Sequence, residues 1–292
     1  MHSFEQGVAL APDYARAHAG LADAYAVLGF YDYLPPTVAF PRADSAARRA
    51  AALDPTLGGP HATLGYVQLY HHWDLRRGEE EFRRAIALEP NYSTAHQWYG
   101  NLLTAAGRFP EAEREMRRAQ EIDPLSLIAN AALGWVFYYA GDPAAAAAQC
   151  QRTLELNPDY ALAHLWRGWA LQELDSIPAA VAEHRLALAL SDSAGLYVAS
   201  LARALAVDGR TGEARALLAR LEARRRADRY APAYEIAKVY AALGQTDEAF
   251  AWLDRAVRER SHSLVFLQVD PQLASLRADP RFVRLRARVF PS

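Results

Sequence analysis

Histidines are the side chains of this 292-residue chain whose type and spacing most suggest chemistry, and a metal site is what they would support. The chain has nine, and two are adjacent in the run Tyr70-His71-His72-Trp73-Asp74. A zinc site needs about four nitrogen, sulfur or oxygen ligands that converge on one point. Adjacent side chains at a helix end point apart, and this run would need further ligands from elsewhere. We therefore expect no metal site in it.

Signatures of catalysis are also missing from the sequence. It contains no phosphate-loop glycine pattern, no nucleophile-elbow serine and no paired catalytic carboxylates in a setting that would assemble a pocket. The single cysteine, Cys150, allows no internal disulfide and fits a reducing compartment. We predict that the chain is not an enzyme and has no catalytic residue, bound metal or cofactor.

A period of 34 residues organises the chain. The tripeptides Glu89-Pro90-Asn91, Asp123-Pro124-Leu125 and Asn157-Pro158-Asp159 place their prolines 34 residues apart. A repeat of this length is typical of a helix-turn-helix unit, which buries its apolar face only by stacking on its neighbours. Histidines at equivalent positions of separate repeats cannot converge on one ion, so we expect His18, His96 and His164 to be packing residues.

The residue types within one period resemble the tetratricopeptide repeat (TPR) family. The unit from Ser93 to Ser126 has seven matching anchors, namely Gly100, Leu103, Gly107, Ala112, Met116, Ala119 and Pro124. Small residues are needed where two helices cross, a glycine ends the first helix in a left-handed conformation, and the proline stops the second helix. The resemblance implies an all-α fold, a right-handed superhelix of about seven helix-turn-helix repeats.

The same register divides the chain into repeats of one elongated domain. We expect a partial repeat at 1–14, a capping segment at 264–292, and repeats at 15–57, 58–92, 93–126, 127–160, 161–194, 195–229 and 230–263. The partial repeat reads as a second helix whose first helix is missing, which suggests a module of a longer protein. The terminal helix, with Arg284, Arg286 and Arg288, should show a solvated outer face.

Four features depart from the repeat pattern. About nine extra residues fall within Tyr31 to Pro41 and are expected to project from one face. The turn at residues 70–74 carries one extra residue, and Asp175 replaces the usual turn glycine. Arg167 occupies a normally buried leucine position, so it should pair with Glu183 or Asp175, or else be exposed by a local shift of the helix.

In a TPR array, the first helix of each repeat lines a concave groove. The positions that face this groove predict a partner-binding set of Tyr66, Tyr70, Asn101, Trp135, Tyr138, Tyr139, Trp169, Gln172, Arg203 and Lys238. Aromatic side chains there would anchor a peptide or partner segment, and Arg203 and Lys238 would receive an acidic group. The alternative is that the curvature of the superhelix packs these rings against neighbouring repeats and leaves little free surface.

A narrower resemblance suggests the setting. One combination of segments looks like the C-terminal TPR region of bacterial multidomain regulators: the insertion at Leu34-Pro35-Pro36, the runs at 96–99 and 123–128, the pair Gly134-Trp135, and the terminal Val269-Asp270-Pro271 and Asp279-Pro280-Arg281-Phe282. In these, the region follows a serine/threonine kinase, a nucleotide cyclase or a winged-helix domain. The resemblance implies a protein-protein interaction scaffold, the regulatory arm of a signalling or transcription protein. The alternative is a small-molecule-sensing module, which should enclose a pocket rather than present an open groove.

Charge and hydropathy limit the partners. With 32 basic and 34 acidic residues the net charge is −2, without the basic excess expected of a nucleic-acid binder. The uncharged stretch from Pro124 to Gly141 is about the minimum length of a membrane helix. It contains residues at repeat positions, however, and we assign it to the array. We expect a bacterial, cytoplasmic protein with a protein or peptide partner, no direct contact with nucleic acid and no membrane association.

Overall fold

The computed structural model describes residues 2–31, 33–191, 195–226 and 230–291, and over these ranges every regular element is helical. In chain order the elements are α1 (His2–Leu10), α2 (Ala15–Phe30), α3 (Pro36–Leu53), α4 (Gly59–Val67), η1 (Gln68–His72), α5 (Leu75–Leu88), α6 (Ser93–Ala105), α7 (Phe109–Ile122), α8 (Leu127–Tyr139), α9 (Pro143–Leu156), α10 (Ala161–Glu173), α11 (Ile177–Ala189), α12 (Gly195–Val207), α13 (Thr211–Arg226), α14 (Ala233–Ala242), α15 (Thr246–Arg258), η2 (His262–Phe266), η3 (Pro271–Leu276) and α16 (Pro280–Val289).

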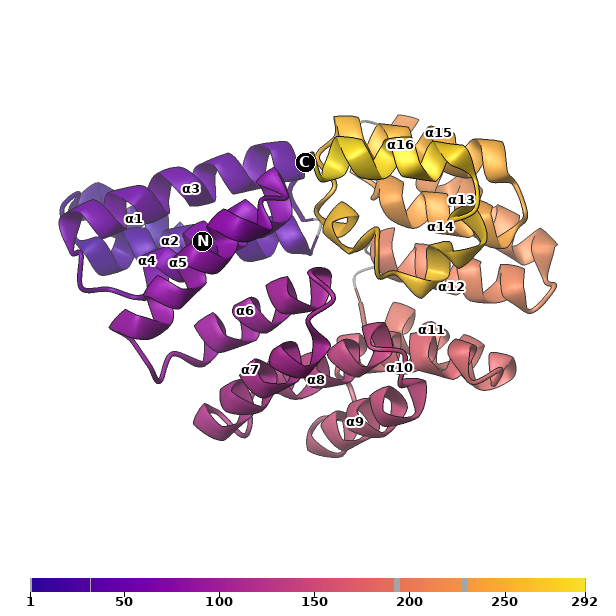
Figure 1. Cartoon of the computed structure of the whole chain (residues 1–292), viewed down its shortest axis with the longest axis horizontal. Coiled ribbons are helices and arrows are strands. Elements are labelled where there is room, and N and C mark those ends of the chain that lie inside the picture. Colours follow the sequence, from indigo (N-terminus) through magenta and orange to yellow (C-terminus); the bar gives the residue numbers. More distant parts are fainter. Residues whose placement is uncertain (1, 32, 192–194, 227–229, 292) are drawn as a thin grey trace.

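Consecutive helices from α2 to α15 pack as antiparallel pairs, and the pairs stack into a superhelix (Figure 1). The all-α superhelical fold expected from the sequence is confirmed. Each repeat range proposed above contains one helix pair, although the borders at Ala194 and Arg229 and the start at Met1 lie outside the described residues. No helix in the described part of the chain is long and apolar enough to cross a bilayer.

The turns inside the repeats follow the expected backbone chemistry. Gly107 and Gly141 have φ angles of 72° and 81°, in the left-handed region that glycine adopts without strain. Asp175 takes the same conformation with a φ of 57°, which a short polar side chain tolerates best among non-glycine residues. Replacement of the glycine by aspartate therefore leaves this turn intact.

The extra residue at 70–74 is absorbed by a π-helical turn. Element η1 widens the end of α4, and Trp73, with a φ of 58°, closes it. A π-turn is the usual way for a helix to hold one additional residue without losing its direction. The helix axis and the packing of the second repeat are thereby preserved.

The insertion at 31–41 differs from the expectation that it projects from the surface. Pro36 begins α3, which is 18 residues long, so the second half of the insertion lengthens a helix rather than forming a loop. Proline suits the first turn of a helix because its missing N–H has no partner there anyway. Phe40 is fully buried, and only the segment before Pro36 is a loop, of which Asp32 lies outside the described residues.

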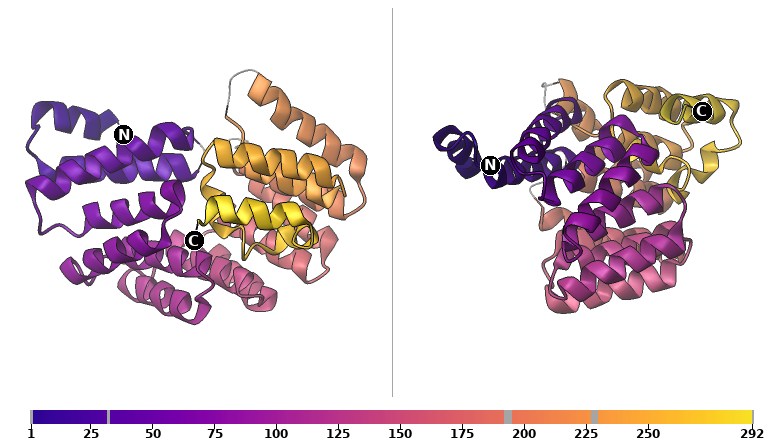
Figure 2. Two further views of the ribbon diagram at one scale, coloured as in Figure 1. Left: turned by 45° about the horizontal axis from the view of Figure 1, so that its top comes forward. Right: turned by 60° about the vertical axis from the view of Figure 1, so that its left-hand side comes forward.

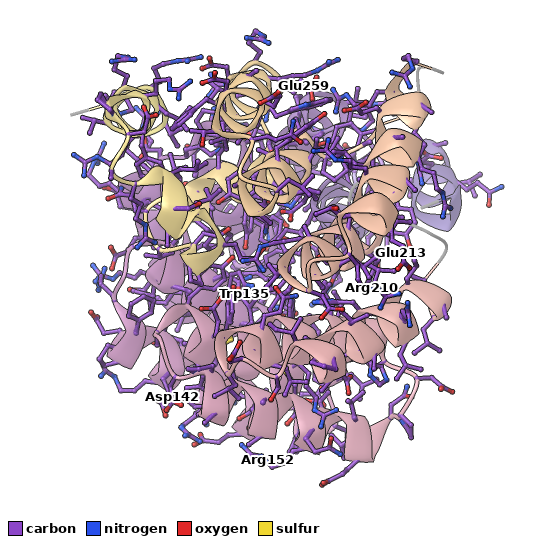
Figure 3. All side chains as sticks on the ribbon, turned by 90° about the vertical axis from the view of Figure 1, so that its right-hand side faces the viewer. Trp135, Asp142, Arg152, Arg210, Glu213 and Glu259 are labelled. Atoms are coloured by element: carbon purple, nitrogen blue, oxygen red, sulfur yellow. The ribbon has the colours of Figure 1, made fainter. Side chains whose placement is uncertain are left out.

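The superhelix curves until its two ends meet. The first repeats and the last repeats lie opposite each other, with the middle repeats joining them (Figures 1 and 2). Contact is direct, since η2 packs against η1 and α6. Charged residues such as Asp142, Arg152 and Arg210 lie at the outside of the molecule, whereas Trp135 lies within it (Figure 3). The continuous core includes residues of both ends.

The Asp23 carboxyl group joins the first repeat to the second. The Thr63 hydroxyl donates a hydrogen bond to Asp23 Oδ1, and the Tyr92 hydroxyl lies 3.4 Å from Asp23 Oδ2. Burial raises the pKa of Asp23 to about 6, although both hydrogen bonds oppose the shift. The Asp23 carboxyl group therefore binds a proton more tightly in the folded protein than in the unfolded chain.

This raised pKa predicts a pH-dependent gain from Asp23→Asn. The folded pKa of Asp23 lies above its unfolded value near 3.9, so its contribution to stability is lost as pH rises from about 4 to 6. Asparagine keeps the acceptor oxygen without the charge. We expect it to raise the free energy of unfolding by about 1–3 kcal/mol at pH 7.5, with a smaller effect toward pH 5. Urea unfolding at both pH values measures this, and an equal effect at both would contradict the raised pKa.

Candidate functional site

The inner face of the superhelix is occupied by the chain's own C-terminal part. We call residues 262–276, which comprise η2 and η3, the clasp. The clasp packs against η1 and α6 from one end of the array and against α14 from the other. Most of its side chains are buried, including His262, Leu264, Phe266 and Leu273. The concave face is therefore filled along this stretch.

Phe266 is the central apolar contact of the clasp. Its ring stacks on Tyr139 at a centroid distance of 5.2 Å and meets the edge of Trp135 at 4.8 Å. The ring of Tyr70, from the second repeat, lies 6.1 Å away. Aromatic pairs at such distances contribute about 0.5–1.5 kcal/mol beyond the burial of their area. One side chain thus joins the second repeat to the fourth.

A buried ionic cluster fixes the other half of the clasp. Lys238 Nζ lies 2.7 Å from Glu235 Oε2 and 3.6 Å from Asp270 Oδ2. The same ammonium group lies 4.9 Å from the centre of the Trp169 ring, within cation–π range. Burial raises the pKa of Glu235, an effect that the charge of Lys238 partly offsets. The clasp carboxylate of Asp270 also accepts a hydrogen bond from the Tyr234 hydroxyl at 3.0 Å.

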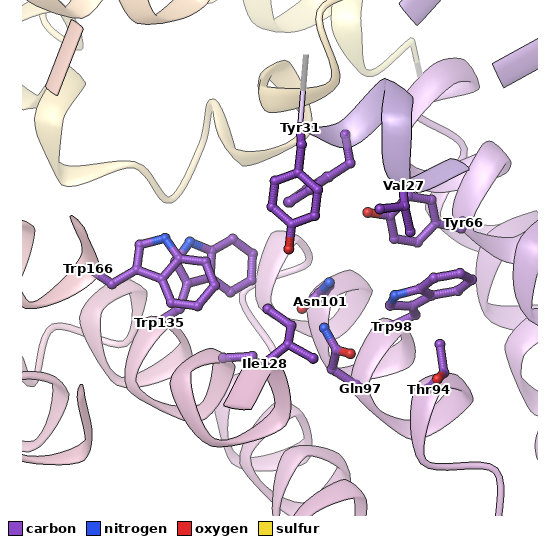
Figure 4. A pocket seen from close by; sticks show the side chains of 12 residues that line it. Val27, Tyr31, Tyr66, Thr94, Gln97, Trp98, Asn101, Ile128, Trp135 and Trp166 are labelled. Carbon is purple, nitrogen blue, oxygen red and sulfur yellow. The ribbon is translucent and has the colours of Figure 1, made fainter. Parts of the chain in front are cut away.

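Beside the clasp, the inner face keeps an open cavity of about 260 Å³, which we call the aromatic pocket. It lies between the first and fifth repeats (Figure 4) and is lined by Val27, Phe30, Tyr31, Tyr66, Thr94, Gln97, Trp98, Asn101, Ile128, Ala132, Trp135 and Trp166. A smaller cavity of about 40 Å³ adjoins it beneath the clasp, next to Trp169 and Lys238.

Two aromatic walls face each other across the aromatic pocket. Tyr66 and Trp98 form one, with ring centres 4.2 Å apart, and Trp135 and Trp166 form the other, with ring centres 6.1 Å apart (Figure 4). All four side chains are at least nine-tenths buried. The Tyr31 ring lies between the two walls, and its hydroxyl group points into the pocket (Figure 4). The pocket is preformed, because packing already fixes its rings.

The polar groups of the aromatic pocket are neutral. Gln97 and Asn101 lie one helical turn apart on α6, and their carboxamides are directed into the space between the walls (Figure 4). Within the described part of the chain, the Gln97 carboxamide makes no hydrogen bond. Burial raises the pKa of the Tyr31 hydroxyl, with smaller contributions from Tyr197 and Tyr33. The lining residues named above therefore supply hydrogen-bond donors and acceptors but no charge.

A family model of the tetratricopeptide repeat matches residues 73–126, 131–194 and 200–263, more than half of the chain. The chain belongs to the tetratricopeptide repeat family. No curated protein matches the sequence significantly.

Solved TPR structures share the fold at low sequence identity. The human IFIT1 dimer with PPP-AAAA is 17% identical, covers 87% of this chain and 66% of its own, and has a TM-score of 0.63. Yeast Tom70 is 17% identical, with coverage of 97% and 60% and a TM-score of 0.56. Pseudomonas aeruginosa PilF is 21% identical, with coverage of 71% and 92% and a TM-score of 0.50. These similarities establish the fold alone.

The structure places the ten predicted groove residues on the inner face of this TPR array but does not leave them free. Nine are buried, and Arg203 is half-buried. The aromatic rings of this set are packed inside the protein, as in the alternative stated above, and the clasp covers most of them. Tyr66, Asn101 and Trp135 line the aromatic pocket, and Tyr139, Trp169 and Lys238 line the smaller cavity.

The remaining four predicted residues make internal contacts. The Tyr70 ring lies near Phe266, and the Tyr138 hydroxyl accepts a hydrogen bond from Gln272 Nε2 at 3.1 Å. Arg203 donates to the side-chain oxygen of Gln172. Lys238 already pairs with Glu235 and Asp270 inside the chain, and the role of Arg203 and Lys238 toward an acidic group of a partner stays a prediction.

Several site residues were missed by the sequence reasoning. Trp98 and Trp166 are each the sixth residue of their repeat, in 93–126 and 161–194, and directly follow a position that faces the groove. A prediction that also included the neighbours of groove-facing positions would have identified them. Phe30 ends α2 and Tyr31 begins the insertion, where the repeat period no longer fixes the position of a residue. Phe266 and His262 come from irregular sequence after the last repeat, which carries no periodic signal.

The histidines at position 4 of their TPR units are packing residues, as expected. Nε2 of His96 lies 3.0 Å from the carbonyl oxygen of Pro90, and Nε2 of His164 lies 2.8 Å from that of Pro158. The Nδ1 atoms lie 2.6 Å from Glu115 and Glu183, and Glu183 also pairs with Arg167. In the described ranges no group of three or more histidine, cysteine or acidic side chains is placed to hold a metal ion.

Removal of the Phe266 ring should destabilise the whole array. Phe266→Ala deletes a buried aromatic side chain, a change that typically costs about 3–5 kcal/mol. We expect a loss of this size in urea unfolding, together with faster hydrogen exchange in residues 262–276. Leu125→Ala, at a position where 77% of the side chain is exposed, serves as the control and should change stability by less than about 0.5 kcal/mol. An equal, small loss in both variants would show that the clasp is not a structural element.

Proposed function

We propose that this TPR array is a protein-protein interaction scaffold that receives a short partner segment at the aromatic pocket. The fold and its TPR neighbours support a protein-interaction scaffold in general. The preformed pocket on the inner face supports this location for the partner site. Buried aromatic rings around a concave space are the usual anchor points of interfaces.

The clasp limits what such a partner can be. An extended peptide along the full concave face would have to displace Phe266 and Asp270, which are buried. A single side chain can enter instead beside Val27, Tyr31, Thr94 and Ile128, which are only partly buried or exposed. The proposal is therefore one anchoring residue in the pocket, with flanking residues on the rim.

We further propose that the array is the regulatory arm of a bacterial signalling or transcription protein. The support is the resemblance of the insertion and terminal motifs to the TPR regions of multidomain regulators. Partner binding would then be transmitted to a kinase, cyclase or winged-helix domain. A coding sequence for such a domain upstream of Met1 is the observation that tests this role.

A small-molecule-sensing module is the second candidate function. It is favoured by the closed form of the inner face, where the pocket is bounded by two aromatic walls and by the first repeat, next to the clasp. At about 260 Å³ the cavity is just below the usual range of ligand sites.

Selection of a random-peptide library on the full chain tests the scaffold. Ile128→Trp fills the mouth of the pocket, so we expect the selected peptides, rich in an aromatic anchor, to bind it at least about tenfold more weakly. Gln151→Trp, at an exposed position of α9, introduces the same side chain outside the pocket and should leave binding unchanged. Circular dichroism melting checks that both variants fold. Peptides that bind Ile128→Trp as tightly as the wild-type chain would place the partner site elsewhere.

A further inference from the structure

The aromatic pocket has a shape and polarity that define a chemical class of ligand. We propose that it binds an uncharged, planar, two-ring heteroaromatic molecule whose edge carries a hydrogen-bond donor next to an acceptor. This inference rests on the second function proposed above. It concerns a free small molecule, not a residue of a protein partner.

The volume sets the size of the ligand. A cavity of about 150 Å³ lined by apolar residues holds one benzene ring. The aromatic pocket, at about 260 Å³, has room for a second fused ring but not for a nucleotide or a longer chain. The clasp and its aromatic neighbours close the inner face on one side of the pocket, so a longer molecule could not extend past Trp135 and Phe266.

The two aromatic walls favour a ligand with a flat ring system. The Tyr66–Trp98 pair and the Trp135–Trp166 pair lie on opposite sides of the space (Figure 4). A planar ring placed between them presents its faces to aromatic side chains on both sides, and such stacking contributes about 1–3 kcal/mol per ring system. A bulky aliphatic molecule would lose this contact.

The carboxamides of Gln97 and Asn101 set the edge chemistry. Each carboxamide has an acceptor oxygen and a donor nitrogen, and the two follow one another along a single face of α6. A ligand edge with adjacent donor and acceptor atoms can pair with such a group in two parallel hydrogen bonds, as asparagine and glutamine do with purine edges. Gln97 is only 8% exposed as a residue, and its carboxamide, which has no hydrogen-bond partner in the described residues, is the group that a ligand would pair with.

The described residues that line the pocket carry no charge, which favours an uncharged ligand. A phosphate or carboxylate would find no cation there, and its desolvation would be uncompensated. A quaternary ammonium ion would meet aromatic faces, but it offers no hydrogen bond to the carboxamides. An uncharged ligand satisfies both the walls and the carboxamides.

Calorimetry on the full chain with named probes tests this assignment. Quinazolin-4(3H)-one is an uncharged bicyclic lactam with the required edge, and we expect saturable binding with one site. Its 3-methyl derivative keeps the shape but lacks the N–H donor, and should bind at least about tenfold more weakly. Tetramethylammonium should not bind at the same concentrations.

Variants then locate the site. Gln97→Leu removes the carboxamide at nearly constant volume and should weaken binding of the lactam about tenfold while binding of the 3-methyl derivative changes less. Gln151→Leu makes the same change at an exposed position and should have no effect. Ile128→Trp should abolish binding of both compounds.

Several results would overturn the inference. No binding of the lactam up to millimolar concentration would do so, as would equal affinity for the lactam and its 3-methyl derivative. Tighter binding of tetramethylammonium would identify a cation cage instead. Tighter binding of N-acetyl-tryptophanamide, combined with loss of the selected peptides in Ile128→Trp, would assign the pocket to a partner side chain. That outcome would refute the small-molecule inference and leave the proposed scaffold function intact.

Discussion

Burial of Phe266 against the inner face is the interaction on which the shape of the molecule depends. A stack of helix pairs has no reason of its own to close, because each repeat contacts only its neighbours. Here one ring packs on Trp135 and Tyr139 from the fourth repeat and lies near Tyr70 from the second. Burial of apolar surface is favourable wherever it occurs along the chain. The clasp therefore holds the curvature of the array at a value that brings its ends together.

The aromatic pocket is a consequence of this closure. The clasp covers the inner face around Tyr139 and Trp169 but does not extend over Gln97 and Trp98 of the third repeat. Phe30, at the end of α2, and Tyr31, at the start of the insertion, also line the pocket, and Tyr31 covers that part from the other side (Figure 4). The pocket is the space that these two coverings leave between them. A groove that would be open in a shorter array becomes a bounded cavity.

The sequence predicted the features that repeat and failed for those that occur once. The 34-residue spacing, the glycines of the turns, and the packing role of His96 and His164 all follow from a local pattern that recurs, so one good unit identifies the others. The extra residue at 70–74 was visible as a break in register, although its π-helical form was not. The insertion was located, but Pro36 was not recognised as the start of a helix.

The clasp could not be predicted, because its contacts are set by the curvature of the whole array. Residues 262–276 form short 3₁₀ turns without periodic hydrophobicity, and their partners include Phe30, more than two hundred residues earlier in the chain than His262. Lys238 illustrates the same point. Its place on the inner face was inferred correctly, but its partner Asp270 comes from a segment that seemed to be an outer cap.

The contact between η2 and η1 also changes how the chain should respond to stress. In an open array, stability is a sum of repeats and neighbouring interfaces, so the end repeats can unravel first and independently. Once the two ends are joined, no repeat is terminal in this sense, and loosening of one end withdraws support from the other. We expect the closed array to unfold in a single cooperative transition, whereas an open array can unfold repeat by repeat. Any molecule that widens or narrows the closed array at one point then acts on all repeats together.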